Sequence, residues 1–234
     1  MQNKLQIPYS SSLKAVVFDL DGTLIDSAPD LHAAMNILLK EQNRDRVTLH
    51  QVTMMIGDGV PKLVERGFEA TGVIPDANIM EQMVARYMEI YDKDTTTLTT
   101  VYPGVIDALQ RLQDHDIKLG VCTNKPFAPA EQIIKEFGLS KYISTLIGGD
   151  TLPGIRKPDG RHLLAVLDAL NVTADQAVMV GDNANDVAVA KNSNVPVIVM
   201  SYGYTRTPSA ELGADMMIDG FDELDGALNK TLKS

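Results

Sequence analysis

The chain has very little cysteine and no tryptophan. Cys122 is the only cysteine among 234 residues, so no disulfide can form within the chain, and we expect a reducing compartment, the cytoplasm. Long apolar runs are also absent. No window approaches the roughly 20 apolar residues that span a bilayer, and residues 1–14 lack the apolar stretch of a signal peptide. The sequence therefore predicts a cytoplasmic protein with no membrane partner.

Basic residues are scarce as well. Lys and Arg together number 21 against 31 Asp and Glu, which gives a formal net charge of −10. Proteins that bind nucleic acid usually present a basic surface, so we expect no nucleic-acid partner. The overall charge also repels anions, and any site for an anionic substrate must supply its own local positive charge.

Short apolar segments alternate with amphipathic segments along much of the chain. This alternation predicts an α/β fold with a Rossmann-like core of three layers, in which helices cover both faces of a parallel sheet. Ligands bind at the carboxyl ends of the strands in such sheets. The predicted strands span residues 14–19, 117–122, 143–147, 177–180, 195–200 and 215–218, and the predicted helices span residues 105–114, 129–137, 161–170, 185–191 and 221–232.

One stretch interrupts this alternation with helical patterns alone. Apolar residues from Leu31 to Leu39 recur at the spacing of one helix face. Further helices are predicted from Thr48, over residues 60–70 and over residues 76–92, and the polar run 95–100 is predicted to return the chain to the sheet. We therefore predict an inserted all-helical cap domain at residues 27–98, and an α/β catalytic core made of residues 1–26 and 99–234.

The segment Asp19-Leu-Asp-Gly-Thr-Leu24 directly follows the first predicted strand. A carboxylate at the end of a buried strand lies at the ligand-binding edge of the sheet. Asp21 follows two residues later, and Gly22 permits a tight backbone turn. Because such a run after a buried strand is rare by chance, we interpret it as functional rather than as an ordinary Asp-Gly turn.

A second apolar strand also ends in a carboxylate. Asp182 follows the strand at 177–180, and Asp186 lies four residues further on. Asp182 alone is equally consistent with a helix cap. Together with Asp19 at the same sheet edge, it forms a candidate site for Mg²⁺, which prefers carboxylate, water and phosphate oxygens.

Two polar pairs complete the set of candidate residues. Thr123-Asn124 follows the strand at 117–122, and Lys157-Pro158 precedes the helix at 161–170. A hydroxyl and backbone N–H groups at a strand end can hold phosphoryl oxygens, and a lysine offers a compact positive charge. Thr-Asn is also an ordinary helix start and a lone loop lysine is usually solvated, so neither pair identifies a site by itself.

These four segments occur in the chain order of the motifs of the haloacid-dehalogenase superfamily, and the sequence resembles that superfamily over nearly its whole length. The predicted helical insertion resembles the superfamily's small helical cap. Residues 18–31, 56–59 and 181–186 are most similar to the corresponding segments of bacterial phosphoglycolate phosphatases.

The resemblance implies a role for each matching residue. Asp19 would attack phosphorus, and Asp21 would protonate the leaving oxygen and later accept a proton from water. Thr123 and Lys157 would hold and neutralise the phosphoryl oxygens. Asp182 would complete a Mg²⁺ site with Asp19 and a backbone carbonyl near Asp21. These roles agree with the chemistry of carboxylate nucleophiles and neighbouring acids.

The resemblance also implies a small phosphorylated metabolite, 2-phosphoglycolate, as the substrate, and we expect the cap to select it. Gly57 and Gly59 precede a predicted helix that carries Lys62, and N–H groups at a helix start can bind a carboxylate. We expect Asn124, Gly57 and Lys62 to contribute to substrate binding. The alternative is that the glycines merely shape a loop and the lysine is solvated.

Other functions stay open at this point. A sugar-phosphate mutase, a pyrophosphatase or another small-metabolite phosphatase would share the first motif, and a non-catalytic module could bind metal and phosphate. A dehalogenase is disfavoured because Asp21 is present. A cysteine phosphatase is excluded, because Ala128 stands where the arginine of a Cys-x5-Arg motif would be. Either a monomer or a homodimer is compatible with the sequence.

Overall fold

A parallel sheet of six strands organises the α/β region of the computed structural model, which describes residues 9–232. Its strands are β1 (Ala15–Phe18), β4 (Lys118–Cys122), β5 (Ile143–Ile147), β6 (Ala177–Gly181), β7 (Val197–Met200) and β8 (Met216–Ile218). The spatial order is β5-β4-β1-β6-β7-β8. The chain builds outward from β1 on one side and then returns to its other side with β6, so the order reverses between β1 and β6. A sheet of this kind holds its ligand at that reversal.

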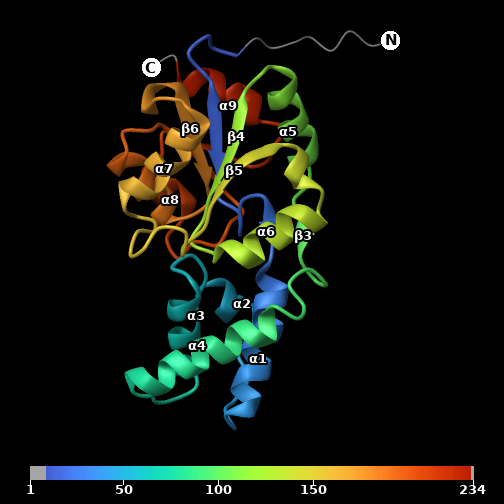
Figure 1. Ribbon diagram of the computed structural model, residues 1–234, viewed down its shortest axis with the longest axis vertical. Helices are drawn as coiled ribbons and strands as arrows, with labels where there is room; N and C mark the ends of the chain where they lie inside the picture. Colours follow the sequence, from blue (N-terminus) through green and yellow to red (C-terminus); the bar gives the residue numbers. More distant parts are fainter. Residues whose placement is uncertain (1–8, 233–234) are drawn as a thin grey trace.

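Helices cover both faces of the sheet, as the sequence predicts (Figure 1). One face carries α5 (Val105–Asp114), α6 (Phe127–Glu136) and α9 (Leu224–Thr231). The other carries α7 (Gly160–Leu170) and α8 (Ala184–Asn192). Three short 3-10 turns lie in the connections, at Leu139–Lys141, Ala174–Gln176 and Ser209–Glu211.

Strand β1 shows why the sheet is buried on both sides. Val16 and Phe18 belong to the apolar cluster beneath α5, α6 and α9, whereas Ala15 and Val17 belong to the cluster beneath α7 and α8. Successive side chains of a strand point to opposite faces, so a strand covered on both faces is a continuous apolar run. The predicted fold class, a three-layer α/β core with a parallel sheet, is confirmed.

A group of four helices lies beyond the carboxyl ends of the strands (Figure 1). These helices are α1 (Ala28–Glu41), α2 (Leu49–Thr53), α3 (Val60–Ala70) and α4 (Ala77–Tyr91). They bury an apolar cluster of their own. Thr48 and Gln51 form a capping box at α2, and the Asp76 carboxylate accepts a hydrogen bond at the start of α4. We call residues 27–98 the helical region and the rest the α/β region; their division into two domains stays a prediction.

The two connections between these regions lie side by side. Strand β2 (Ile25–Asp26) pairs with β3 (Thr100–Val101) in an antiparallel ladder. The Asp30 carboxylate accepts hydrogen bonds from the N–H groups of Leu98 and Thr99, which fixes the returning segment. The sequence analysis missed this ladder, because two residues per strand are too few to show a period.

Element boundaries differ little from the predicted ones. The last helix begins at Leu224 rather than at Phe221. The Phe221 ring is buried and packs against Phe18, with the ring centroids 6.2 Å apart. Among residues 9–232, no helix combines the length and apolar character needed to cross a bilayer.

Candidate active site

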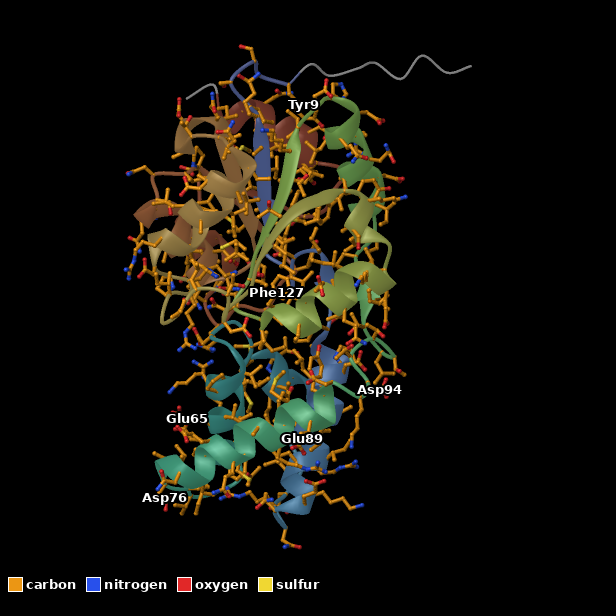
Figure 2. The ribbon with its side chains drawn as sticks, in the orientation of Figure 1. Tyr9, Glu65, Asp76, Glu89, Asp94 and Phe127 are labelled. Carbon is orange, nitrogen blue, oxygen red and sulfur yellow. The ribbon has the colours of Figure 1, made fainter. Side chains whose placement is uncertain are left out.

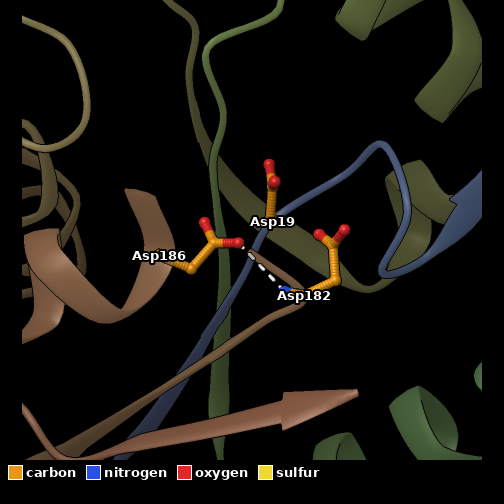
Figure 3. A group of neighbouring side chains, drawn as sticks. All are labelled: Asp19, Asp182 and Asp186. Carbon is orange, nitrogen blue, oxygen red and sulfur yellow. Dashed lines mark hydrogen bonds between the residues drawn. The ribbon is translucent and has the colours of Figure 1, made fainter. Parts of the chain in front are cut away.

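Three buried carboxylates meet where the strand order reverses. Asp19 directly follows β1, Asp182 directly follows β6, and Asp186 lies in the first turn of α8. Each offers an oxygen within 4.8 Å of the oxygens of the other two (Figure 3). Strands β1 and β6 pair in parallel with Phe18 beside Val180. The pairing register itself therefore brings Asp19 and Asp182 to one edge of the sheet.

The Asp182 carboxylate is held by two donors from distant loops. Thr23 Oγ1 donates to its Oδ1 at 3.0 Å, and the Tyr204 N–H donates to its Oδ2 at 2.5 Å. Gly22 adopts a left-handed φ of +88°, and a side chain there would collide with the Asp182 carboxylate. Gly22 and Thr23 thus both help to position the Asp182 carboxylate.

Asp186 is engaged at both of its oxygens. Its Oδ2 accepts hydrogen bonds from the N–H groups of Asp182, at 2.9 Å, and Asn183, at 3.1 Å, in a capping box at the start of α8. Its Oδ1 forms an ion pair with Lys157 Nζ at 2.6 Å. These contacts favour an orienting role for Asp186 over direct metal binding.

Lys157 joins Asp186 to Asp19. Its Nζ lies 2.9 Å from Asp19 Oδ1, and the residue is only 3 % exposed. Burial alone would lower the pKa of Lys157, but the carboxylates of Asp186 and Asp19 outweigh burial and raise it above the ordinary range. Lys157 is therefore a permanent cation between two buried carboxylates.

The charges of this group do not balance without a further cation. Three carboxylates face one ammonium group, a net charge of −2 when all are ionised. Burial, as the largest cause, raises the pKa of Asp19 to about 7 and holds the pKa of Asp182 well above its usual range. A divalent cation beside Asp19 and Asp182 would restore neutrality, and carboxylate oxygens are the ligands that Mg²⁺ prefers. The residues present therefore fit the predicted Mg²⁺ site.

Thr123 and Asn124 follow β4 on the other side of Asp19. Thr123 is 1 % exposed, and its hydroxyl accepts a hydrogen bond from the Lys125 N–H at 3.2 Å, so its own proton is available to a ligand. Asn124 Nδ2 donates to the carbonyls of Gly57 and Lys157, and its Oδ1 accepts from the Lys157 N–H. The Asn124 amide thus fastens two loops together, and both of its N–H donors are committed.

Asp21 lies near Asp19 but outside the three-carboxylate group. Its Oδ1 accepts a hydrogen bond from Ser27 Oγ at 2.6 Å and lies 3.1 Å from Lys125 Nζ. Lys125 also donates to Tyr91 Oη, at the end of α4, over 2.8 Å. Burial would lower the pKa of Lys125, but Asp21 and Tyr91 outweigh it and raise this pKa above the usual range.

A pocket opens between the α/β region and the helical region. The α/β side contributes Asp19, Asp21, Thr123, Asn124 and Lys125, and the helical side contributes Leu31, Ile56, Gly57, Gly59, Val60, Leu63 and Tyr91. The cavity measures about 40 Å³, which is room for no more than a few water molecules. Both glycines have left-handed φ values, +113° for Gly57 and +86° for Gly59.

Lys62 is the predicted site residue that lies away from this pocket, at the surface. Its Nζ pairs with Glu65 at 2.5 Å, and its side chain is 43 % exposed. Glu65 lies on the outer side of the helical region (Figure 2). The structure thus brings Asp19, Asp21, Thr123, Asn124 and Gly57 around one cavity, with Lys157 and Asp182 behind it, and leaves Lys62 at the surface.

Side chains of both regions tie the loop at Gly57 to the α/β region. Asp58 accepts a hydrogen bond from Asn185 Nδ2 at 2.7 Å and forms ion pairs with Arg66 at 2.5 Å and Arg206 at 2.9 Å. Burial would raise the pKa of Asp58, but these donors lower it to about 2. The helical region is therefore held against the site by charged contacts at the pocket rim.

Sequence reasoning missed Lys125, Tyr91 and the Asp58 contacts. Lys125 had a usable signal, because it stands beside Thr123-Asn124 at the end of a predicted strand. Tyr91 had none, since it sits 34 residues away along the chain on a helix whose packing is not visible in the sequence. Surface charges such as Arg206 carry no local mark that distinguishes a rim contact from a solvated side chain.

Comparisons with known proteins agree on one family. The family model for haloacid dehalogenase-like hydrolases matches residues 16–200. The phosphoglycolate phosphatase of Rhodospirillum rubrum is 46% identical over 215 residues, which cover 90% of this chain and 89% of that protein. The phosphoglycolate phosphatase of Cereibacter sphaeroides (strain ATCC 17029) is 40% identical over 220 residues, covering 94% of this chain and all of its own length, 100%.

Solved structures show the same architecture. A crystal structure described as a predicted phosphoglycolate phosphatase from Haemophilus somnus 129PT superposes with a TM-score of 0.87 at 27% sequence identity. The match covers 93% of this chain and 98% of that one. The similarity therefore extends over both the α/β region and the helical region.

Proposed function

Because this chain belongs to the haloacid dehalogenase-like hydrolase family, we propose that it hydrolyses 2-phosphoglycolate to glycolate and phosphate through an aspartyl-phosphate on Asp19. The observation that carries this proposal is the meeting of Asp19, Asp182 and Asp186 with Lys157 at one sheet edge. The relatives named phosphoglycolate phosphatase support the choice of substrate.

Asp19 has one oxygen held and one left for attack. Its Oδ1 accepts hydrogen bonds from the Leu20 N–H at 2.7 Å and from Lys157 Nζ at 2.9 Å. Among residues 9–232, no group donates to Oδ2. Oδ2 would form the new bond to phosphorus while the bond from phosphorus to the ester oxygen breaks, so one hard hydrolysis becomes two easier steps.

Asp21 would act as the general acid in the first step and as the general base in the second. It gives a proton to the ester oxygen as that oxygen leaves with glycolate, and later takes one from the water that attacks the aspartyl-phosphate. That second attack breaks the bond between phosphorus and Asp19 Oδ2 and releases inorganic phosphate. Ser27 and Lys125 hold the Asp21 carboxylate for this work.

The phosphoryl oxygens carry charge throughout the transfer. The Thr123 hydroxyl and the Lys157 ammonium would stabilise that charge. Asp19, Asp182 and the backbone carbonyl of Asp21 would hold Mg²⁺, which when bound neutralises phosphoryl charge and orients the transferring group. Asp186 would keep Lys157 and the Asp182 backbone in place.

The helical wall would select the substrate. The narrow pocket and its apolar lining would favour a small metabolite over a sugar bisphosphate or a nucleotide. Gly57 would contribute to binding directly, Asn124 through the loops that it holds together, and Lys62 at longer range. We also propose that the enzyme works in the cytoplasm, as a monomer or a homodimer.

A substrate panel tests the proposal. We would measure kcat/KM for 2-phosphoglycolate, a hexose 6-phosphate, pyrophosphate and p-nitrophenyl phosphate, each with Mg²⁺ and with excess chelator. We expect 2-phosphoglycolate to be preferred and all turnover to require Mg²⁺. Preference for pyrophosphate, or conversion of a sugar phosphate to its isomer, would favour another member of the family. A folded protein with no turnover of any ester would indicate a binding module.

A further inference from the structure

Lys125 is the one cation among the described residues that line the pocket. We propose that its ammonium group binds the substrate's carboxylate and so determines specificity from the α/β side. This inference rests on the proposed function and adds a residue that the motif analysis did not single out.

The position of Lys125 is fixed before any ligand arrives. The residue is 6 % exposed, and its Nζ donates to Tyr91 Oη at 2.8 Å and to Asp21 at 3.1 Å. The Tyr91 ring lies 4.7 Å from Nζ, in cation–π contact. An ammonium group has three donors, and Nζ has three acceptor atoms among residues 9–232: Tyr91 Oη and both Asp21 oxygens, the second of these at 3.3 Å. A ligand carboxylate would take over the donor of that longest bond.

Backbone donors lie on the opposite wall of the same pocket. The N–H groups of Gly57, Asp58 and Gly59 have no acceptor within the described part of the chain, although Gly57 and Gly59 line the cavity. All three residues are partly exposed, so these N–H groups are open to water or to a ligand. A carboxylate between this loop and Lys125 would accept hydrogen bonds from the loop's N–H groups and from the Lys125 ammonium group.

The surroundings of Lys125 strengthen its charge. Leu31, Ile56, Val60 and Leu63 form the apolar part of the pocket, and charges interact more strongly where water is excluded. Lys157 does not serve this end of the substrate, because it lies between Asp19 and Asp186 and does not line the pocket. Each lysine would therefore serve a different end of the substrate.

The spacing along the chain suits a short diacid. Thr123, which we assign to the phosphoryl group, and Lys125 lie two residues apart in one loop, with the Lys125 N–H bonded to Thr123 Oγ1 at 3.2 Å. In 2-phosphoglycolate, only one methylene group separates the carboxylate from the phosphate ester oxygen. A rigid loop can hold both ends of so short a molecule.

Lys125 could instead act only through Asp21, as a positioning residue for the proton donor. The two roles differ in what they do to substrates without a carboxylate. Loss of a carboxylate ligand harms only substrates that carry one. Loss of an Asp21 partner harms every phosphate ester that needs a protonated leaving group.

The experiment compares Lys125→Met with wild type on two substrates in Mg²⁺. One substrate is 2-phosphoglycolate, and the other is its amide, the phosphate ester of glycolamide, which has the same size and no carboxylate charge. We expect kcat/KM for 2-phosphoglycolate to fall roughly 10- to 150-fold, the range for loss of one hydrogen bond to a charged group. Most of the loss should appear in KM. The amide should lose only the smaller part of the effect that runs through Asp21, so the ratio of kcat/KM for the acid to kcat/KM for the amide should fall at least about fivefold. Lys135→Met, an exposed lysine of α6, is the matched control and should change neither substrate.

Equal losses on both substrates would overturn the inference and assign Lys125 to Asp21. Unchanged kinetics on both would overturn it as well. Lys125→Arg keeps the charge and should retain part of the preference for the acid over the amide, which provides a readout if Lys125→Met folds poorly. A wild-type enzyme that does not turn over 2-phosphoglycolate would instead overturn the proposed function, and this inference with it.

Discussion

The two walls of the pocket differ in the kinds of side chain that they present. The α/β wall presents carboxylates, a threonine, an asparagine and a lysine, nearly all of them buried and tied to one another. The helical wall presents apolar side chains, two glycines and the Tyr91 hydroxyl. The α/β wall thus carries the groups that can transfer a phosphoryl group. The helical wall limits the size of the pocket, excludes water from it and provides backbone N–H donors.

This contrast suggests how the two walls can change independently. The groups of the α/β wall and those directly behind it depend on one another: Asp186 holds Lys157, Lys157 holds Asp19, and Thr23 holds Asp182. A change there disturbs the whole network. The apolar side chains of the helical wall make no such mutual hydrogen bonds, so substitutions there should alter substrate choice more than the chemistry. The predictions below test that division, from the largest expected effect to the smallest.

Asp19→Asn should have the largest effect. An amide cannot form the aspartyl-phosphate, so we expect kcat for 2-phosphoglycolate and for p-nitrophenyl phosphate to fall by at least roughly 10⁴-fold. The variant removes one of three clustered like charges, so its metal-free Tm should not fall. Steady-state kinetics with both esters, together with thermal unfolding, provide the measurement. Turnover equal to wild type in a folded variant would refute the nucleophile assignment.

Removal of the metal should come next. We expect a chelator to abolish turnover of both esters, and Mg²⁺ at about 100 times its Kd to stabilise the wild-type protein by about 2.7 kcal/mol. Asp182→Asn should lower kcat/KM roughly 10²- to 10³-fold and remove most of the Mg²⁺-dependent rise in Tm. Asp175→Asn, an exposed carboxylate, is the control. An unchanged Tm rise in Asp182→Asn would place the metal elsewhere.

Gly57→Ala tests the helical wall. Its φ of +113° is a conformation that alanine adopts only under strain, while the nearest atoms to an added Cβ lie 3.7 Å away, so the loop should shift rather than clash. We expect kcat/KM for 2-phosphoglycolate to fall about tenfold, with a smaller change for p-nitrophenyl phosphate.

Gly138→Ala provides the control for Gly57→Ala. It has a left-handed φ of +67° and no atom within 4 Å of an added Cβ, and it does not line the pocket. It should cost about 1 kcal/mol of stability without altering the ratio of the two kcat/KM values. Equal loss on both esters in Gly57→Ala would show that the helical wall takes part in the chemistry.

Most of the fold was predictable because its signals are local. Buried strands such as β1 and β6 are short apolar runs, and the starts of α2 and α4 are marked by the capping residues Thr48 and Asp76. The pairing of β2 with β3 was not predictable, because it joins two residues from each of two distant segments. Nothing in either segment alone indicates its partner.

The site was predictable where a residue follows a strand and not where it depends on packing. Parallel strands end at a common edge of the sheet, so the sequence alone predicts that Asp19, Asp182 and Thr123 lie close together. Lys125 and Tyr91 meet only because the end of α4 comes close to the loop that follows β4. The prediction for Lys62 relied on its helix alone, and the sequence could not show which way that side chain turns.

Lys62→Gln should therefore have the smallest effect. Its side chain is 43 % exposed and paired with Glu65, and an exposed pair of this kind is worth at most about 1 kcal/mol. The remaining influence of Lys62 on substrate is its charge, acting through solvent over about one Debye length, roughly 8–10 Å. We expect kcat/KM for 2-phosphoglycolate to fall about twofold through KM, and p-nitrophenyl phosphate, which carries one negative charge fewer, to change less. The effect should vanish in about 1 M salt, where the Debye length is about 3 Å.

Lys40→Gln, an exposed lysine of α1, controls for net charge. A loss above about tenfold that persists in high salt would mean that Lys62 contacts the substrate directly, and the helical wall would then supply a charged group as well as shape.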